Sequence, residues 1–96
     1  DVWASMGEEA KIAERIALLK PFKVTVGVME ATGRPEAIFL HCLPCFHNLD
    51  TEMSRQNPDI CEADDEVFEG SWSRVFDQAE NRMHTIKAVM VATLGR

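Results

Sequence analysis

The sequence predicts an α/β fold that is rich in helix, with part of a parallel sheet and a long C-terminal helix. Three observations carry this prediction. Residues 37–43 (AIFLHCL) form an almost continuous apolar run, residues 79–94 carry an apolar stripe at helical spacing, and 96 residues are enough for one domain at most. The apolar share of 46% and the charged share of 27% are those of an ordinary globular protein, which excludes disorder, collagen and coiled coil as descriptions of the whole chain.

The first predicted helix covers residues 11–20, where Ile12, Ile16 and Leu19 recur at helical spacing. Pro21 predicts the end of this helix, because the residue before a proline resists the helical region.

The next segment, residues 22–33, is ambiguous. Three valines alternate like those of a strand, whereas Thr25 can cap a helix and Gly33 with Pro35 can stop one. We expect a short helix here.

Residues 37–43 are the clearest strand. Their β-branched and aromatic content favours a strand that is covered on both faces, as in a parallel sheet, and Pro44 ends it. Residues 45–63 are polar and irregular, so we expect a long loop of the kind that can form a lid or bind a ligand. Residues 50–69 hold eight acids and one base, which we interpret as a solvated face.

The last helix is predicted over residues 77–94. Asp77 can act as its N-cap, Glu80 can complete a capping box, and Gly95 predicts its end. Val89 and Val91 widen its apolar face, so we expect it to pack against more than one neighbour. The stripe itself consists of Ala79, Met83, Ile86, Met90 and Leu94.

Charge and cysteine content exclude several classes of protein. The formal charge is -6 and the pI about 4.9, so the chain lacks the positive surface that binds nucleic acid.

The longest strictly apolar stretch, residues 88–92, is far shorter than the roughly twenty residues that span a membrane. No signal peptide is evident, and three cysteines favour the reducing cytoplasm or an organelle matrix. The chain begins at Asp1 without Met, so we expect a fragment of a longer protein.

Residues 41–47 (HCLPCFH) form the densest group of chemically active side chains, and their spacing leaves four interpretations open. Cys42 and Cys45 have the spacing of a redox dithiol, and with His41 and His47 they can supply four zinc ligands. However, a redox pair belongs at a helix N-terminus, and four ligands within one short segment rarely converge. The group can also be buried cysteines with a hydrogen-bonded histidine, or a substrate site at the carboxyl end of a parallel strand.

Two further clusters are candidates for ligand binding. Residues 1–7 combine a carboxylate, a hydroxyl and a Met-Gly turn before a helix, whose backbone N–H groups can hold an anion. Residues 77–84 place Arg82 near the positive end of the last helix, and its guanidinium suits a carboxylate or phosphoryl oxygen. Alone, each also fits an ordinary loop or helix cap.

Taken together, these clusters resemble the ornithine carbamoyltransferase family. The motifs are D-V-W-x-S-M-G at residues 1–7, F-L-H-C-L-P-x-F-H at 39–47, D-E-V-F-E at 65–69 and V-F-D-Q-A-E-N-R-M-H at 75–84, continued by T-I-K-A-V-M-V-A-T-L at 85–94. The resemblance implies that residues 1–96 are the C-terminal portion of an ornithine-binding domain, a fragment of a parallel-sheet three-layer domain, with the carbamoyl-phosphate domain absent. It also implies that the final helix reaches back towards that absent domain.

The family reaction transfers a carbamoyl group from carbamoyl phosphate to the δ-amine of ornithine, which gives citrulline and phosphate. The resemblance implies no cofactor and no metal, and a homo-oligomer built on trimers. It implies that Cys42 and Leu43 offer backbone carbonyls, and Cys42 also its sulfur, to the carbamoyl amide and the δ-amine. Arg82 is expected to bind the carbamoyl oxygen or phosphate, so that Cys42 and Arg82 are catalytic. The residues expected to hold ornithine are Asp1, Ser5 and Met6.

The sequence also departs from the family pattern. Cys45 stands where the family usually has Ala, Asn48 replaces a usual Asp, and residues 51–61 diverge. The phosphate-binding S-T-R-T-R loop and the H-P-x-Q segment of the family are missing, so we expect these 96 residues alone to make no citrulline. The alternatives are a metal or dithiol module at Cys42 and Cys45, and a non-catalytic ornithine-binding paralogue.

Overall fold

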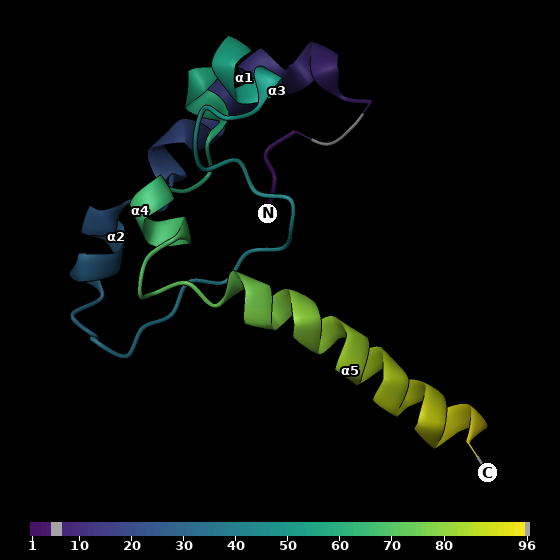
Figure 1. The fold of residues 1–96 in the computed structure, drawn as a ribbon. Helices are drawn as coiled ribbons and strands as arrows, with labels where there is room; N and C mark the ends of the chain where they lie inside the picture. Colours follow the sequence, from purple (N-terminus) through teal and green to yellow (C-terminus); the bar gives the residue numbers. More distant parts are fainter. Residues whose placement is uncertain (5–6, 96) are drawn as a thin grey trace.

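The computed structural model describes residues 1–4 and 7–95, which form an elongated, helix-rich body (Figure 1). It measures 51 × 38 × 23 Å, and α5 extends away from the other helices. The helix-rich character predicted from the sequence is therefore confirmed. The described elements are the α-helices α1 (Ile12–Leu19), α2 (Val26–Ala31), α3 (Glu52–Gln56), α4 (Asp65–Phe68) and α5 (Val75–Leu94), with 3₁₀ turns at Glu9–Lys11, Lys20–Phe22 and Pro58–Ile60.

Helix α1 confirms the first predicted helix. Pro21 does not stop the coil at once, because the chain passes from α1 into a 3₁₀ turn that includes the proline. Arg15 ties the N-terminal segment to this helix. Its guanidinium forms an ion pair with Glu8 at 2.8 Å and donates a hydrogen bond to the Trp3 carbonyl at 3.2 Å. These contacts fix where residues 1–4 approach the rest of the molecule.

Helix α2 confirms the short helix predicted within residues 22–33. The Thr25 hydroxyl caps it by accepting a hydrogen bond from the Val28 N–H at 3.2 Å. Just before it, Val24 forms an isolated parallel bridge with Ala63. The Val24 N–H donates to the Glu62 carbonyl and the Asp64 N–H donates to the Val24 carbonyl, both at 2.9 Å. Residues 62–64 are thereby fixed beside the start of α2.

The strand predicted over residues 37–43 is wrong for the part of the chain that the structure describes. Phe39 forms only an isolated parallel bridge with Ser73. The reason is local: the neighbouring chain turns into α5 at Val75, directly after this contact, so no ladder can continue. The segment also has one buried side rather than two. Phe39 and His41 are 6% and 7% exposed, whereas Ile38 and Leu40 are about half exposed.

The long loop predicted over residues 45–63 is wrong in part, because it contains α3 and a 3₁₀ turn. The Thr51 hydroxyl caps α3 by accepting from the Ser54 N–H at 3.1 Å. Helix α4, which follows at Asp65, was not predicted either. It is too short for a hydrophobic period to reveal it, and it is held by the burial of Val67 and Phe68.

One apolar core joins α2, α4 and the start of α5. It gathers residues that lie far apart in the sequence, and their burial is the main source of stability of this body. Its buried members are Met29, Phe39, Ala63, Val67, Phe68 and Val75.

Helix α5 begins at Val75, three residues before the start that an N-cap at Asp77 implies. Asp77 is therefore not its N-cap, and the expected capping box is wrong: Arg74 occupies the N-cap and makes no side-chain cap bond. The Arg74 N–H instead donates to the Phe39 carbonyl at 3.0 Å, which fixes the chain at this point and lets the helix start directly after it. Gly95 confirms the predicted end by donating to the Val91 carbonyl at 3.0 Å.

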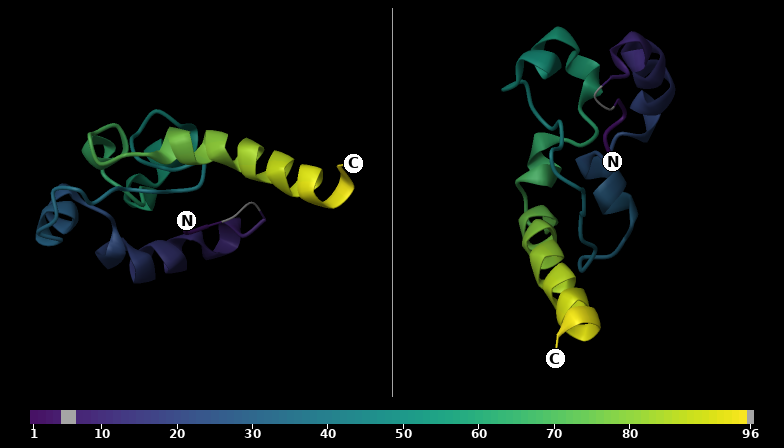
Figure 2. Two further views of the ribbon diagram at one scale, coloured as in Figure 1. Left: turned by 90° about the horizontal axis from the view of Figure 1, so that it is seen from below. Right: turned by 90° about the vertical axis from the view of Figure 1, so that its right-hand side faces the viewer.

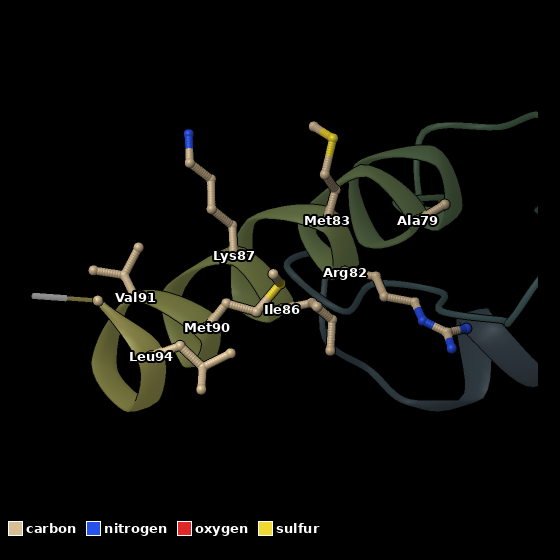
Figure 3. Close-up of a pocket in the computed structure, with 9 residues that line it drawn as sticks. Ala79, Arg82, Met83, Ile86, Lys87, Met90, Val91 and Leu94 are labelled. Atoms are coloured by element: carbon tan, nitrogen blue, oxygen red, sulfur yellow. The ribbon is translucent and has the colours of Figure 1, made fainter.

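The apolar stripe of α5 does not pack as predicted within the described residues. Only Val75 of this helix is buried, and side chains such as Met83 and Leu94 are 62% and 75% exposed. The stripe lines an open groove of about 780 Å³ in which Arg82 and Lys87 are the charged members (Figure 3). Figure 2 shows how far α5 projects, which explains why the described part of the chain leaves it uncovered. No helix in the described ranges is long and apolar enough to cross a membrane.

Candidate functional site

A cavity of about 290 Å³ lies where the 38–46 segment meets the first turns of α5. It is smaller than the groove along α5, but it contains the polar groups and backbone that binding requires. We therefore treat it as the candidate site. Its lining residues are His41, Cys42, Leu43, Gln78, Ala79 and Arg82.

Gln78 joins the two walls of this cavity. Its side-chain oxygen accepts a hydrogen bond from the His41 N–H at 3.0 Å. Together with the contact between Arg74 and Phe39, this bond holds the backbone of the 38–46 segment against α5. The backbone of this wall is thus held in place by hydrogen bonds to the Gln78 side chain and from the Arg74 N–H. We did not identify Gln78 from the sequence, because nothing in its spacing shows which backbone group it reaches.

Asp1 and Cys42 are brought together, although they lie at opposite ends of the described N-terminal half. The Cys42 thiol donates a hydrogen bond to Asp1 Oδ1 at 3.3 Å, and the Val2 N–H donates to the same oxygen at 2.8 Å. Cys42 is an exposed, free cysteine. Ser5 and Met6, the other residues expected to hold ornithine, lie outside the described residues.

Arg82 lines the cavity together with Cys42 and Leu43. The helix dipole acts most strongly in the first turn of a helix. Because α5 begins at Val75, Arg82 lies beyond that turn. Its fixed charge and its planar group of N–H donors, rather than the helix end, are therefore what it can offer an anion.

The His41 side chain is buried and lies against Glu62. Its Nε2 lies 3.8 Å from Glu62 Oε1, and both side chains are 4% exposed. Burial raises the pKa of the Glu62 carboxyl above its usual value. Burial, followed by the Glu62 charge, raises the pKa of the nearby Cys45 thiol to about 12. Sequence reasoning missed Glu62, which lies in the acidic stretch that we interpreted as a solvated face.

The four zinc ligands suggested by residues 41–47 do not converge in the described structure. His47 instead faces Asp65, with 2.5 Å between its Nδ1 and Oδ1, and its ring stacks on Phe68 with centroids 3.7 Å apart. Cys42 and Cys45 are free thiols rather than a disulfide. A zinc site that uses all four of these residues, and a disulfide between Cys42 and Cys45, are therefore not supported.

The chain is similar to known proteins over almost all of its length. A family model described as aspartate/ornithine carbamoyltransferase, Asp/Orn binding domain, matches residues 1–93. A phaseolotoxin-insensitive ornithine carbamoyltransferase 2 from Pseudomonas syringae pv. actinidiae is 63% identical over 98% of this chain, which covers 29% of that relative. A catabolic ornithine carbamoyltransferase from Bacillus cereus is 56% identical over 99% of this chain and 30% of the relative. The solved ornithine carbamoyltransferase from Pyrococcus furiosus aligns with a TM-score of 0.70 and 38% identity, covering 95% of this chain and 25% of that one. The chain thus spans less than a third of these relatives.

Proposed function

Because the chain belongs to the aspartate/ornithine carbamoyltransferase family, we propose that the complete protein containing it transfers a carbamoyl group from carbamoyl phosphate to the δ-amine of ornithine. The products are citrulline and phosphate. One observation carries the assignment beyond family membership: Cys42, Leu43 and Arg82 line a single cavity, and Asp1 contacts Cys42 at its edge. Residues 1–96 supply the later part of the ornithine-binding domain in this proposal.

The reaction requires an uncharged amine and a polarised carbonyl. The δ-amine resembles that of lysine, whose pKa is about 10.4, so it must lose a proton before it attacks. In the proposed site Asp1, with Ser5 and Met6, holds the amino-acid end of ornithine. When ornithine and carbamoyl phosphate are held side by side, a bimolecular step becomes effectively unimolecular, which lowers the entropic part of the barrier.

Arg82 is proposed to stabilise the charge that develops on the carbamoyl oxygen and on the departing phosphate. A guanidinium can give two parallel hydrogen bonds to such oxygens, and the bonds strengthen as negative charge accumulates. The backbone carbonyls of Cys42 and Leu43 are proposed acceptors for the carbamoyl NH₂ and the δ-amine. Gln78 supports this role, because it fixes the backbone from which those carbonyls project.

The rest of the proposal concerns the complete protein. We propose that residues 1–96 are completed there into a three-layer α/β domain, that a separate part binds carbamoyl phosphate, and that the subunits assemble into a trimer-based oligomer in the cytoplasm. The two isolated parallel bridges, at Val24 and at Phe39, support a sheet whose further pairing uses strands outside residues 1–96. Light scattering of the complete protein measures the oligomer directly.

The test is an assay of the complete protein for citrulline, with carbamoyl phosphate and either ornithine or aspartate as acceptor. We expect citrulline with ornithine and no carbamoyl transfer to aspartate. Calorimetric titration with ornithine accompanies the assay. Binding of both substrates without turnover would reject catalysis and identify a binding paralogue, and transfer to aspartate would reject the proposed specificity.

A further inference from the structure

A second constellation lies beneath the candidate site and plays no part in the proposed reaction. A ring nitrogen of His41, Cys45 Sγ and a Glu62 carboxylate oxygen all lie within 4.8 Å of one another. His41 and Cys45 come from the 38–46 segment, whereas Glu62 comes from the chain that pairs with Val24. These three side chains offer one nitrogen, one sulfur and one oxygen atom to a common point.

The two most buried members of this cluster face each other without a hydrogen bond. In the described structure, His41 Nε2 and Glu62 Oε1 are both buried and both lack a hydrogen-bond partner. The other ring nitrogen, Nδ1, contacts the Cys42 carbonyl, which can only accept, so Nδ1 carries a proton. In the neutral imidazole Nε2 is then an acceptor, and it meets a second acceptor 3.8 Å away. Such an arrangement requires a shared positive species between the two atoms.

We propose that His41, Cys45 and Glu62 form a buried binding site for a divalent transition-metal ion, with Zn²⁺ as the best match. Zinc accepts this mixture of imidazole, thiolate and carboxylate ligands and commonly has four ligands. Three come from the protein and water completes the set, since Cys45 is only partly buried and leaves one side of the cluster open.

The geometry of the cluster suits zinc. Bonds of about 2.0–2.3 Å at tetrahedral angles separate neighbouring ligand atoms by roughly 3.3–3.8 Å. The 3.8 Å between Nε2 and Oε1 falls at the upper end of this range, and the third atom requires only a small shift.

The outer contacts are also those of a metal site. The Cys42 carbonyl fixes the tautomer and orientation of His41, and the Phe46 N–H donates to the second oxygen of Glu62 at 2.9 Å. Metal-bound histidines and carboxylates are commonly oriented in this way by backbone groups.

The charge balance of the cluster points in the same direction. A neutral imidazole, a thiolate and a carboxylate carry two negative charges together, which a divalent ion cancels. On binding, the Cys45 thiol releases its proton to solvent and its sulfur bonds to the metal. The resulting site is neutral, which is the state that burial favours.

The competing occupant is a proton that His41 and Glu62 share, which needs no cysteine. The test therefore uses Co²⁺, because a bond between cobalt and thiolate gives a charge-transfer band in the near ultraviolet. The complete protein is stripped with a chelator and titrated with Co²⁺ and then with Zn²⁺. We expect one equivalent of Co²⁺ to produce the band and Zn²⁺ to displace it.

Three variants identify the ligands. Cys45→Ala removes the sulfur with little loss of packing, and we expect it to abolish the band and weaken Zn²⁺ binding by more than the roughly 10- to 100-fold that loss of an outer partner costs. Cys61→Ala and Cys42→Ser are the matched controls, and both should keep the band. Circular dichroism checks that each variant is folded.

The proposal is overturned if the stripped protein gives no band, if the band persists in Cys45→Ala, or if it disappears in Cys42→Ser. None of these measurements depends on citrulline formation. A failure of the metal site is therefore distinguishable from a failure of the proposed reaction.

Discussion

The two sides of the 38–46 segment differ sharply in what surrounds them. On the inner side, Phe39 lies in the apolar core and His41 faces Glu62, both nearly without solvent. On the outer side, Cys42 and Leu43 are exposed and line the cavity beside Arg82. Within a few residues the chain thus passes from the buried core to the wall of the candidate site.

This difference shows how a fold can make a reactive surface rigid. The outer residues contribute backbone groups and a thiol, which need accurate positions but little burial of their own. Their positions come from the inner residues, which are fixed by core packing, and from Gln78, which fixes the backbone to α5. We expect substitutions on the inner side to affect stability first and those on the outer side to affect turnover first.

The largest effect is expected for Phe39→Ala in the complete protein. Truncating this buried ring removes apolar contacts and leaves a cavity, which costs about 3–5 kcal/mol in the free energy of unfolding. The neighbouring Ile38 is 52% exposed, so Ile38→Ala serves as the matched control with a change within about 0.5 kcal/mol. Urea unfolding measures both. Equal losses of unfolding free energy in the two variants would contradict the difference between the inner and outer sides, because they would show that the outer side is buried as well.

Arg82→Ala is the matching substitution on the outer side. Removing a donor to a developing oxyanion lowers turnover by about 100- to 1,000-fold. Because Arg82 is exposed, we expect its loss to change the free energy of unfolding by no more than about 0.5 kcal/mol. Citrulline formation and urea unfolding are measured on the same preparations, with Glu80→Gln as an exposed control on α5. A variant with near-normal turnover would reject the role assigned to Arg82.

Gln78 links the two sides, so its substitution should affect both readouts. In Gln78→Met the His41 N–H loses its acceptor, at a cost of about 1–3 kcal/mol, and the backbone at Cys42 and Leu43 is less well fixed. We expect kcat to fall by about 10-fold or more while KM changes little. Gln78→Glu keeps an oxygen acceptor and should recover most of the activity. If the two variants behave alike, the hydrogen bond is not what matters.

The sequence predicts the local elements of this fold better than its tertiary contacts. The helices at α1, α2 and α5 are visible because apolar spacing, the Thr25 cap and Gly95 act within a few residues. The strand over residues 37–43 failed because an apolar run shows that a segment is buried but not whether a neighbouring chain continues alongside it. The residue before Val75 becomes an N-cap through its bond to the Phe39 carbonyl, a contact that no local pattern contains.

The candidate site shows the same division. Cys42, Leu43 and Arg82 were predicted as site residues because the resemblance to ornithine carbamoyltransferases rests on the motifs that contain them, and the structure places all three along one cavity. Glu62 could not, because an acid in an acidic stretch is usually exposed, and its burial depends on the bridge between Val24 and Ala63.

The smallest predicted effect concerns two acidic residues, Glu62 and Asp64. They lie two residues apart, but one is buried and the other is partly exposed. Glu62 is buried and its pKa is raised, whereas Asp64 is about one third exposed and its pKa is lowered below the usual 3.8. The first cause for Asp64 is the hydrogen bond from Lys23, whose Nζ lies 2.9 Å from Oδ1. A lowered pKa in the folded state adds stability above the usual value, and this contribution is lost as the pH falls through the lowered pKa.

Lys23→Met should therefore destabilise the protein by up to about 1 kcal/mol at neutral pH, because a partly exposed ion pair contributes no more than this. The difference from the parent protein should shrink towards zero as acid protonates Asp64, since Lys23 then faces an uncharged carboxyl group. Glu62 responds in the opposite direction, because a raised pKa gives stability that is present below the usual value of 4.5 and is lost as the pH rises through the folded value. It responds equally in both proteins, so the difference between them isolates Asp64. Urea unfolding from about pH 7 down to about pH 3 measures this difference. A gap that stays constant over this range would mean that the aliphatic stem of Lys23, rather than its charge, stabilises the contact.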